Sequence, residues 1–161
     1  MQLSGKGGFA PLFASLLLVA NPGAAYDAFE RTIPELQAAM ARGETTAVEL
    51  VRQYLARIEA FDHNGPKLNA MIHVNPRAIE EAAALDRERA AGNIRGPLHG
   101  IPILLKDNYD THDMPTTAGA IAMAGFVPKD DAYQVRRLRE AGAVFIGKTN
   151  LHELAFGGTG Y

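Results

Sequence analysis

One stretch decides the fold of this chain: Gly96-Pro97-Leu98-His99-Gly100-Ile101-Pro102-Ile103-Leu104-Leu105-Lys106-Asp107-Asn108. Glycine and proline mark turns before a short apolar run, Ile101 to Leu105, and the polar pair Asp107-Asn108 marks a turn soon after it. A short apolar run bounded by turn signals predicts a buried strand. Lys106 is therefore expected at the C-terminal end of a core strand, which is the edge where open α/β sheets place ligand crevices.

Two interpretations of Lys106 follow from this position. A lysine after a strand is commonly the first solvated residue of the next turn. A lysine held in a dry crevice would instead be pushed towards its neutral form, and a neutral amine can act as a base. The residues of the stretch alone leave both interpretations open.

The rest of the chain predicts helices alternating with strands. Thr32 with Glu35, and Thr46 with Glu49, have the spacing of capping boxes. We expect helices over 32–42, over about four turns from Thr46, over 77–91 and over 132–141, a short helix over 150–156, and further strands over 68–74 and 143–146. The strands over 101–105 and 143–146 are separated by a helix, which predicts parallel pairing through a right-handed crossover and an α/β fold.

The predicted helix over 132–141 has a clear apolar face. Asp130 or Asp131 is expected to cap its N-terminus. Helical spacing places three apolar residues inward and four charged residues outward: Val135, Leu138 and Ala141, against Arg136, Arg137, Arg139 and Glu140.

Composition excludes several classes of function. The 161 residues are 47% hydrophobic and 21% charged, which is typical of a globular protein of one modest domain. The net charge of −2 gives no basic field for nucleic acid. The absence of cysteine excludes disulfides, a thiolate nucleophile and cysteine-ligated metal.

Residues 1–25 have the pattern of a secretory signal peptide. Lys6 gives one positive charge, Phe9 to Ala20 is mostly apolar, and small residues precede a cleavage point expected after Ala25. The apolar part is shorter than the roughly 20 residues of a transmembrane helix, so no stable membrane span is expected after cleavage. An uncleaved anchor or a buried N-terminal helix is the alternative. The prediction is an exported protein, periplasmic or secreted.

Three further features need a choice of interpretation. Gly142 to Thr149, GAVFIGKT, satisfies the P-loop pattern literally, but its four middle residues are the predicted strand itself, and a strand makes a poor phosphate cradle. We expect Lys148 to support the turn after this strand. Asp110, His112 and Asp113 alternate along a short turn and are predicted to form a solvated loop in preference to a metal site. His73 is predicted to be a strand-face residue without a catalytic role.

The organising stretch resembles the lysine-bearing segment of the amidase signature family of serine amidohydrolases. Further segments resemble that family in the same order: Pro115-Thr-Thr-Ala-Gly119, Leu138-Arg-Glu-Ala-Gly-Ala143, and Gly147-Lys-Thr-Asn-Leu151 with Glu153. The resemblance spans roughly 32–161. It implies an amidase-signature-like α/β fold, in which N-terminal helices pack on part of a mixed central sheet. It also implies that 26–161 is the N-terminal portion of a truncated amidase domain, incomplete at its C-terminus.

The resemblance implies a catalytic triad of a nucleophilic serine, a bridging serine in a cis peptide, and a lysine base. Lys106 matches the base, and Ala155, Phe156 and Gly157 match a wall of the substrate pocket. Neither serine can be assigned, because the only serines are Ser4 and Ser15 in the predicted signal.

The expected function is therefore hydrolysis of the C–N bond of a carboxamide, with a small-molecule amide as substrate and no metal or cofactor. The exported character argues against the tRNA-dependent amidotransferase subunits, whose lysine segment is similar. One alternative is a truncated, non-catalytic amidase fragment. A weaker alternative is an NTP-binding module built on GAVFIGKT. The sequence leaves the oligomeric state open.

Overall fold

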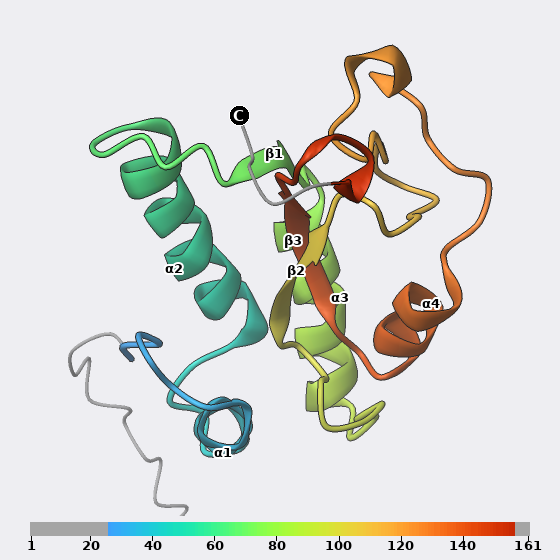
Figure 1. The fold of residues 1–161 in the computed structure, drawn as a ribbon. Coiled ribbons are helices and arrows are strands. Elements are labelled where there is room, and N and C mark those ends of the chain that lie inside the picture. Colours follow the sequence, from blue (N-terminus) through green and yellow to red (C-terminus); the bar gives the residue numbers. More distant parts are fainter. Residues whose placement is uncertain (1–25, 157–161) are drawn as a thin grey trace, which may run out of the picture.

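The structure is a computed structural model that describes residues 26–156 of the chain. The predicted signal segment 1–25 and the predicted pocket residue Gly157 lie outside the described residues. The described residues alternate helices and strands, as Figure 1 shows. Their order is α1 (Ile33–Ala41), α2 (Ala47–Ile58), a π-helical turn (Glu59–His63), β1 (Met71–Val74), α3 (Ala78–Ala90), β2 (Pro102–Lys106), a 3₁₀ turn (Ile121–Met123), α4 (Tyr133–Glu140), β3 (Val144–Thr149) and a 3₁₀ turn (Glu153–Ala155).

Both predicted capping boxes are confirmed. The hydroxyl of Thr46 accepts a hydrogen bond from the backbone N–H of Glu49 at 3.1 Å, and the Glu49 carboxylate accepts one from the Thr46 N–H at 2.9 Å. Thr32 and Glu35 repeat this arrangement at the start of α1. Each box satisfies backbone donors that the first helical turn leaves without a partner.

The predicted cap of the last helix is wrong. The N-cap of α4 is Ala132, and no side chain caps this helix. The carboxylate of Asp131 accepts hydrogen bonds from His112 and Arg139 instead. Arg139 in the last turn of α4 and His112 in the loop after β2 bind the carboxylate that the sequence pattern assigned to the N-terminus of this helix.

The three strands form one mixed sheet in the order β1-β3-β2. β2 pairs with β3 in parallel, as predicted, and Lys106 lies opposite Thr149. β1 pairs with β3 antiparallel and is shorter than the predicted strand over 68–74. Asn69 has a positive φ of 51°, and the Asp62 carboxylate accepts the N–H of Ala70, so this part of the chain bonds to a side chain and not to a strand.

β3 is buried on both faces. Val144 and Ile146 pack into a core with residues of α1, α2 and α3, whereas Phe145 packs with Val135 of α4 and Leu105 of β2. In Figure 1, α2 and α4 accordingly lie on opposite sides of the sheet. A strand covered on both faces reads as a continuous apolar run, which is why Ala143 to Ile146 was identifiable from sequence.

Among residues 26–156, no helix is both long enough and apolar enough to cross a bilayer.

Candidate active-site edge

Lys106 is the last residue of β2, and its side chain is exposed. Its neighbours Leu105 and Asp107 are buried, so the alternation of an extended chain points Lys106 the other way. Within residues 26–156, its amine has no hydrogen bond or ion pair. Of the two interpretations of Lys106, solvent exposure is the one seen among the described residues, and its role as a base stays a prediction.

A buried ion pair lies directly beside Lys106. The ammonium group of Lys148 is 3.3 Å from Oδ1 of Asp107, and the two side chains are 0% and 1% exposed. Lys148 also donates to the backbone oxygens of Tyr109 (2.9 Å) and Pro115 (3.2 Å), and to the hydroxyl of Thr116 (2.9 Å). Burial lowers the pKa of Lys148 below its ordinary value, although nearby carboxylates, Asp107 first among them, act in the opposite direction.

The same ion pair settles two expectations about Lys148. It lies within β3, with its ammonium group enclosed by protein oxygens, so it is not a free phosphate ligand of a P-loop. The expectation that Lys148 supports the turn after its own strand is wrong, because its hydrogen-bond partners belong to Asp107 and the loop after β2.

Asp107 connects this ion pair to the segment that follows. Its Oδ2 accepts hydrogen bonds from the N–H (2.9 Å) and the hydroxyl (2.5 Å) of Thr117, and its backbone oxygen accepts one from Ala118 at 2.9 Å. The segment that begins at Thr116 therefore passes close to the lysine-bearing strand.

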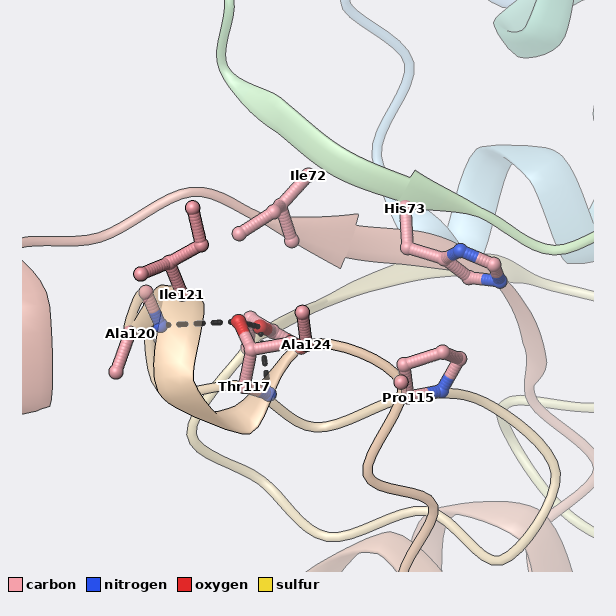
Figure 2. A pocket seen from close by; sticks show the side chains of 10 residues that line it. Ile72, His73, Pro115, Thr117, Ala120, Ile121 and Ala124 are labelled. Carbon is pink, nitrogen blue, oxygen red and sulfur yellow. Dashed lines mark hydrogen bonds between the residues drawn. The ribbon is translucent and has the colours of Figure 1, made fainter.

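A cavity of about 420 Å³ opens at this edge of the sheet. Figure 2 shows it between β1, which contributes Ile72 and His73, and the segment after β2. His73 was predicted to have no role, and the structure places it on the wall of this cavity. The other lining residues are Asp107, Pro115, Thr117, Gly119, Ala120, Ile121, Ala124 and Gly125.

The predicted pocket residues Ala155 and Phe156 lie in or next to the last 3₁₀ turn and are exposed, Phe156 to 83%. The N–H of Leu154 donates to the backbone oxygen of Ala118 at 2.8 Å. This bond places the turn against the segment that Asp107 holds, and so near the same edge as Lys106. Neither residue lines the 420 Å³ cavity, and their role in a substrate pocket stays a prediction.

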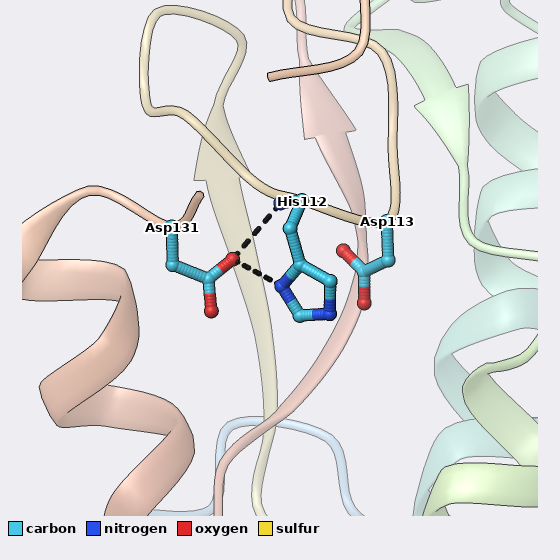
Figure 3. Close-up of side chains that lie close together, drawn as sticks. All are labelled: His112, Asp113 and Asp131. Atoms are coloured by element: carbon cyan, nitrogen blue, oxygen red, sulfur yellow. Dashed lines mark hydrogen bonds and ion pairs between the residues drawn. The ribbon is translucent and has the colours of Figure 1, made fainter. Parts of the chain in front are cut away.

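A second group of polar residues lies beside α4. Figure 3 shows His112 and Asp113 close to Asp131, whose carboxylate accepts hydrogen bonds from the backbone and the ring of His112. Arg139 forms ion pairs with Asp131 at 2.9 Å and with Asp113 at 3.1 Å. Because a guanidinium already neutralises both carboxylates, this cluster has the character of an ion-pair network and not of a metal site.

This network corrects two predictions. The carboxylate of Asp113 is 8% exposed, so the turn around it is not simply solvated. Arg139 was placed on the outer face of its helix, but its side chain is 26% exposed and turns towards the two aspartates. A pair of acidic groups can hold an arginine partly buried. Helical periodicity does not predict this outcome, because it considers only the residues of the helix itself.

Asp107 and Thr117 were not predicted from sequence to be functional residues of this edge. A usable signal was present: Lys148 lies within an apolar strand, and lysine is almost never fully buried without a partner. That rule predicts a nearby carboxylate but not which of the many in the chain supplies it.

Comparisons with known proteins agree with this geometry. A sequence profile of the family described as Amidase matches residues 49–161. One glutamyl-tRNA(Gln) amidotransferase subunit, from Thermobifida fusca, is 48% identical over 124 residues, which are 76% of this chain and 24% of that protein. The native peptide amidase of Stenotrophomonas maltophilia has a TM-score of 0.76 and 56% identity, covering 78% of this chain and 26% of that one. An amidase family protein of Bacillus anthracis has a TM-score of 0.74 and 40% identity, covering 78% and 25%.

The chain thus spans about a quarter of the length of these relatives. The family profile covers most of the chain, and the solved structures share its arrangement of helices on a mixed sheet. On these grounds the chain belongs to the amidase signature family.

Proposed function

We propose that the full-length protein hydrolyses the C–N bond of a carboxamide and that Lys106 is the base of its catalytic triad. The observation that carries this proposal is the position of Lys106 at the C-terminal edge of β2, with an exposed amine. This position belongs to a chain that is 56% identical to a peptide amidase over 78% of its length. An amine at this edge is available to a reactive group on a neighbouring segment.

The proposed chemistry needs two serines in addition to Lys106. Neutral Lys106 takes a proton from a bridging serine, which in turn deprotonates the nucleophilic serine. The nucleophile attacks the amide carbonyl, ammonia or an amine leaves with the transferred proton, and water hydrolyses the acyl-enzyme. Residues 26–161 contain no serine, so both serines are proposed to come from parts of the full-length protein outside this sequence.

We further propose that the substrate is a linear amide of a peptide or of a similarly small molecule. Identity to the peptide amidase is 56%, compared with 48% to the amidotransferase protein of Thermobifida fusca. The proposed export through residues 1–25 also favours this choice, because aminoacyl-tRNA is found inside the cell. If the protein is found not to be exported, glutamyl-tRNA amidotransfer becomes the leading alternative.

The test is Lys106→Ala in the full-length protein. We expect kcat for release of ammonia from peptide amides to fall by about 10³-fold, within the range attributed to general acid–base catalysis. The thermal midpoint should change little, because the side chain is exposed and has no partner within 26–156.

Lys129→Ala is the matched control, since Lys129 is another exposed lysine. It should leave kcat unchanged. Full turnover in Lys106→Ala would contradict the assignment of the base.

The sequence leaves two alternative functions. A non-catalytic role for the 161 residues alone is compatible with the absence of serine from 26–161, and we propose that this segment has no amidase activity by itself. NTP binding through GAVFIGKT has no support from the surroundings of Lys148, whose ammonium group is fully buried among protein oxygens.

A further inference from the structure

The backbone on both sides of the Lys106 side chain is held in place by β3 and by the following loop. Lys106 lies opposite Thr149 in the parallel pair, and the N–H of Asp107 donates to the Thr149 oxygen at 3.1 Å. The oxygen of Lys106 accepts from the N–H of Tyr109 at 3.0 Å. The direction of the Lys106 side chain therefore depends on how firmly the first residues after β2 are fixed.

Lys148 is the group around which those residues are arranged. Its ammonium has three hydrogens, and four oxygens lie within 3.3 Å: one from Asp107 and three from the loop at Tyr109, Pro115 and Thr116. These oxygens span ten residues of chain, so a single side chain sets the path of the whole loop after Lys106. The Lys148 side chain is completely buried, and these protein oxygens can accept all three of its ammonium hydrogens.

Asp107 connects Lys148 to the segment that contains Thr117. One carboxylate oxygen faces Lys148, and the other accepts both donors of Thr117. Asp107 therefore fixes the distance between the end of β2 and the segment 117–118, of which Thr117 lines the 420 Å³ cavity. The residue that follows Lys106 is thus bound at its backbone and at both carboxylate oxygens.

Net stability is a poor explanation for such a pair. Removing two charges from water costs several kcal/mol per ion, and well-packed apolar residues of similar volume often stabilise a protein as well or better. Apolar residues form no directional bonds, so they would not hold four oxygens at hydrogen-bonding distance from one point. The ion pair therefore fixes the positions of the loop atoms around it, and a pair of apolar residues would not.

We propose that Asp107 and Lys148 are positioning residues of the amidase, which hold Lys106 in the orientation required of the base. This inference rests on the proposed function of Lys106. Asp107 and Lys148 act through the backbone and do not themselves touch the reacting atoms.

The experiment compares three variants of the full-length protein: Asp107→Asn, Lys148→Met and the double variant. Each single change should lower kcat by about 100-fold with little change in KM, as expected for a misplaced catalytic group. Lys148→Met should also lower the thermal midpoint, because it leaves Asp107 buried without its partner. The double variant removes both charges and should regain the part of that midpoint that is due to the unpaired Asp107, while its kcat stays low.

Asp86→Asn is the matched control. Asp86 accepts the backbone N–H groups of Ala47 and Val48 at the start of α2, so the substitution weakens a carboxylate contact away from the sheet edge. Its midpoint should fall without a comparable loss of kcat.

The outcomes separate the two proposals. Recovery of kcat together with the midpoint in the double variant, or unchanged kcat in the single variants, would show a structural role only and overturn the positioning role. Full activity in Lys106→Ala would instead remove the assignment of Lys106 as the base, and the positioning role with it.

Discussion

At the scale of the single residue, Gly147 shows how closely the strands approach one another. It lies in β3 next to Lys148, and a methyl group there would overlap the backbone oxygen of His73 and lie 2.6 Å from Cε of Met71. Gly147 lies opposite Val74, and the pairing of β1 with β3 shifts between Met71 and His73, opposite the adjacent residues Lys148 and Thr149. The second glycine of the P-loop-like pattern therefore has a packing role, which is to let the backbone of β1 come close.

Gly147→Ala is expected to destabilise the full-length protein by about 1–3 kcal/mol, the usual cost of overpacking a filled core. The midpoint of urea or thermal unfolding measures this effect. Gly96→Ala is the control, because a methyl group at Gly96 would meet its nearest atom, the Ala141 oxygen, at 3.4 Å. Equal midpoints for the two variants would refute the crowding at Gly147.

At the scale of the element, the network of Asp131, Arg139, Asp113 and His112 attaches the loop after β2 to α4. Burial alone would raise the pKa of Asp131, but hydrogen bonds from Arg139 and His112 outweigh it and lower the pKa below its ordinary value. Glu81 faces the same network, and burial, followed by the charge of Asp113, raises its pKa. The two acids therefore contribute to the pH dependence of stability with opposite signs.

Asp131→Asn tests this arrangement. A carboxylate whose pKa is lower in the folded state stabilises the protein above its unfolded-state pKa of about 3.9, and loses this contribution as the pH falls through the folded-state value. The thermal midpoint of Asp131→Asn should thus lie below that of the unchanged protein at pH 7, and the gap should narrow in acid.

Asp130→Asn, at the exposed neighbouring position, should show no such gap. A gap for Asp131→Asn that is constant between neutral and acidic pH would exclude an ionic origin.

At the scale of the whole molecule, the chain spans about a quarter of the length of its relatives, and its described residues form a sheet of three strands. β2 and β1 are both edge strands of the three described here, and Leu104 of β2 is 41% exposed. A second cavity, of about 440 Å³, is largely apolar and brings Leu104 together with Leu68 and Phe61. Open strand edges and exposed apolar residues are costly features when they face water.

The 161-residue chain alone should show no amide hydrolysis at concentrations where the full-length protein hydrolyses peptide amides readily. The reason is that residues 26–161 contain no serine. Ammonia release from peptide amides measures both. Turnover by the 161 residues that disappears on Lys106→Ala would contradict the need for serines from elsewhere.

Much of the fold was predictable because its signals are local. The capping boxes depend on residues three positions apart, and the helices and strands on periodicity within one segment. Strand β1 was predicted too long because Asp62, eight residues before Ala70, captures the N–H of that residue. The cap expected from Asp131 failed for a similar reason, since Arg139 and His112 compete for the same carboxylate.

The sequence by itself determined the family, the order of helices and strands, and the place of Lys106 at the end of a core strand. Only the tertiary structure decided that Lys148 pairs with Asp107, 41 residues away, and that Arg139 turns inward. The physical reason is that a buried charge must find a partner, but many carboxylates could serve, and the choice is made by the packing of distant segments. Local sequence patterns therefore do not predict which carboxylate becomes the partner.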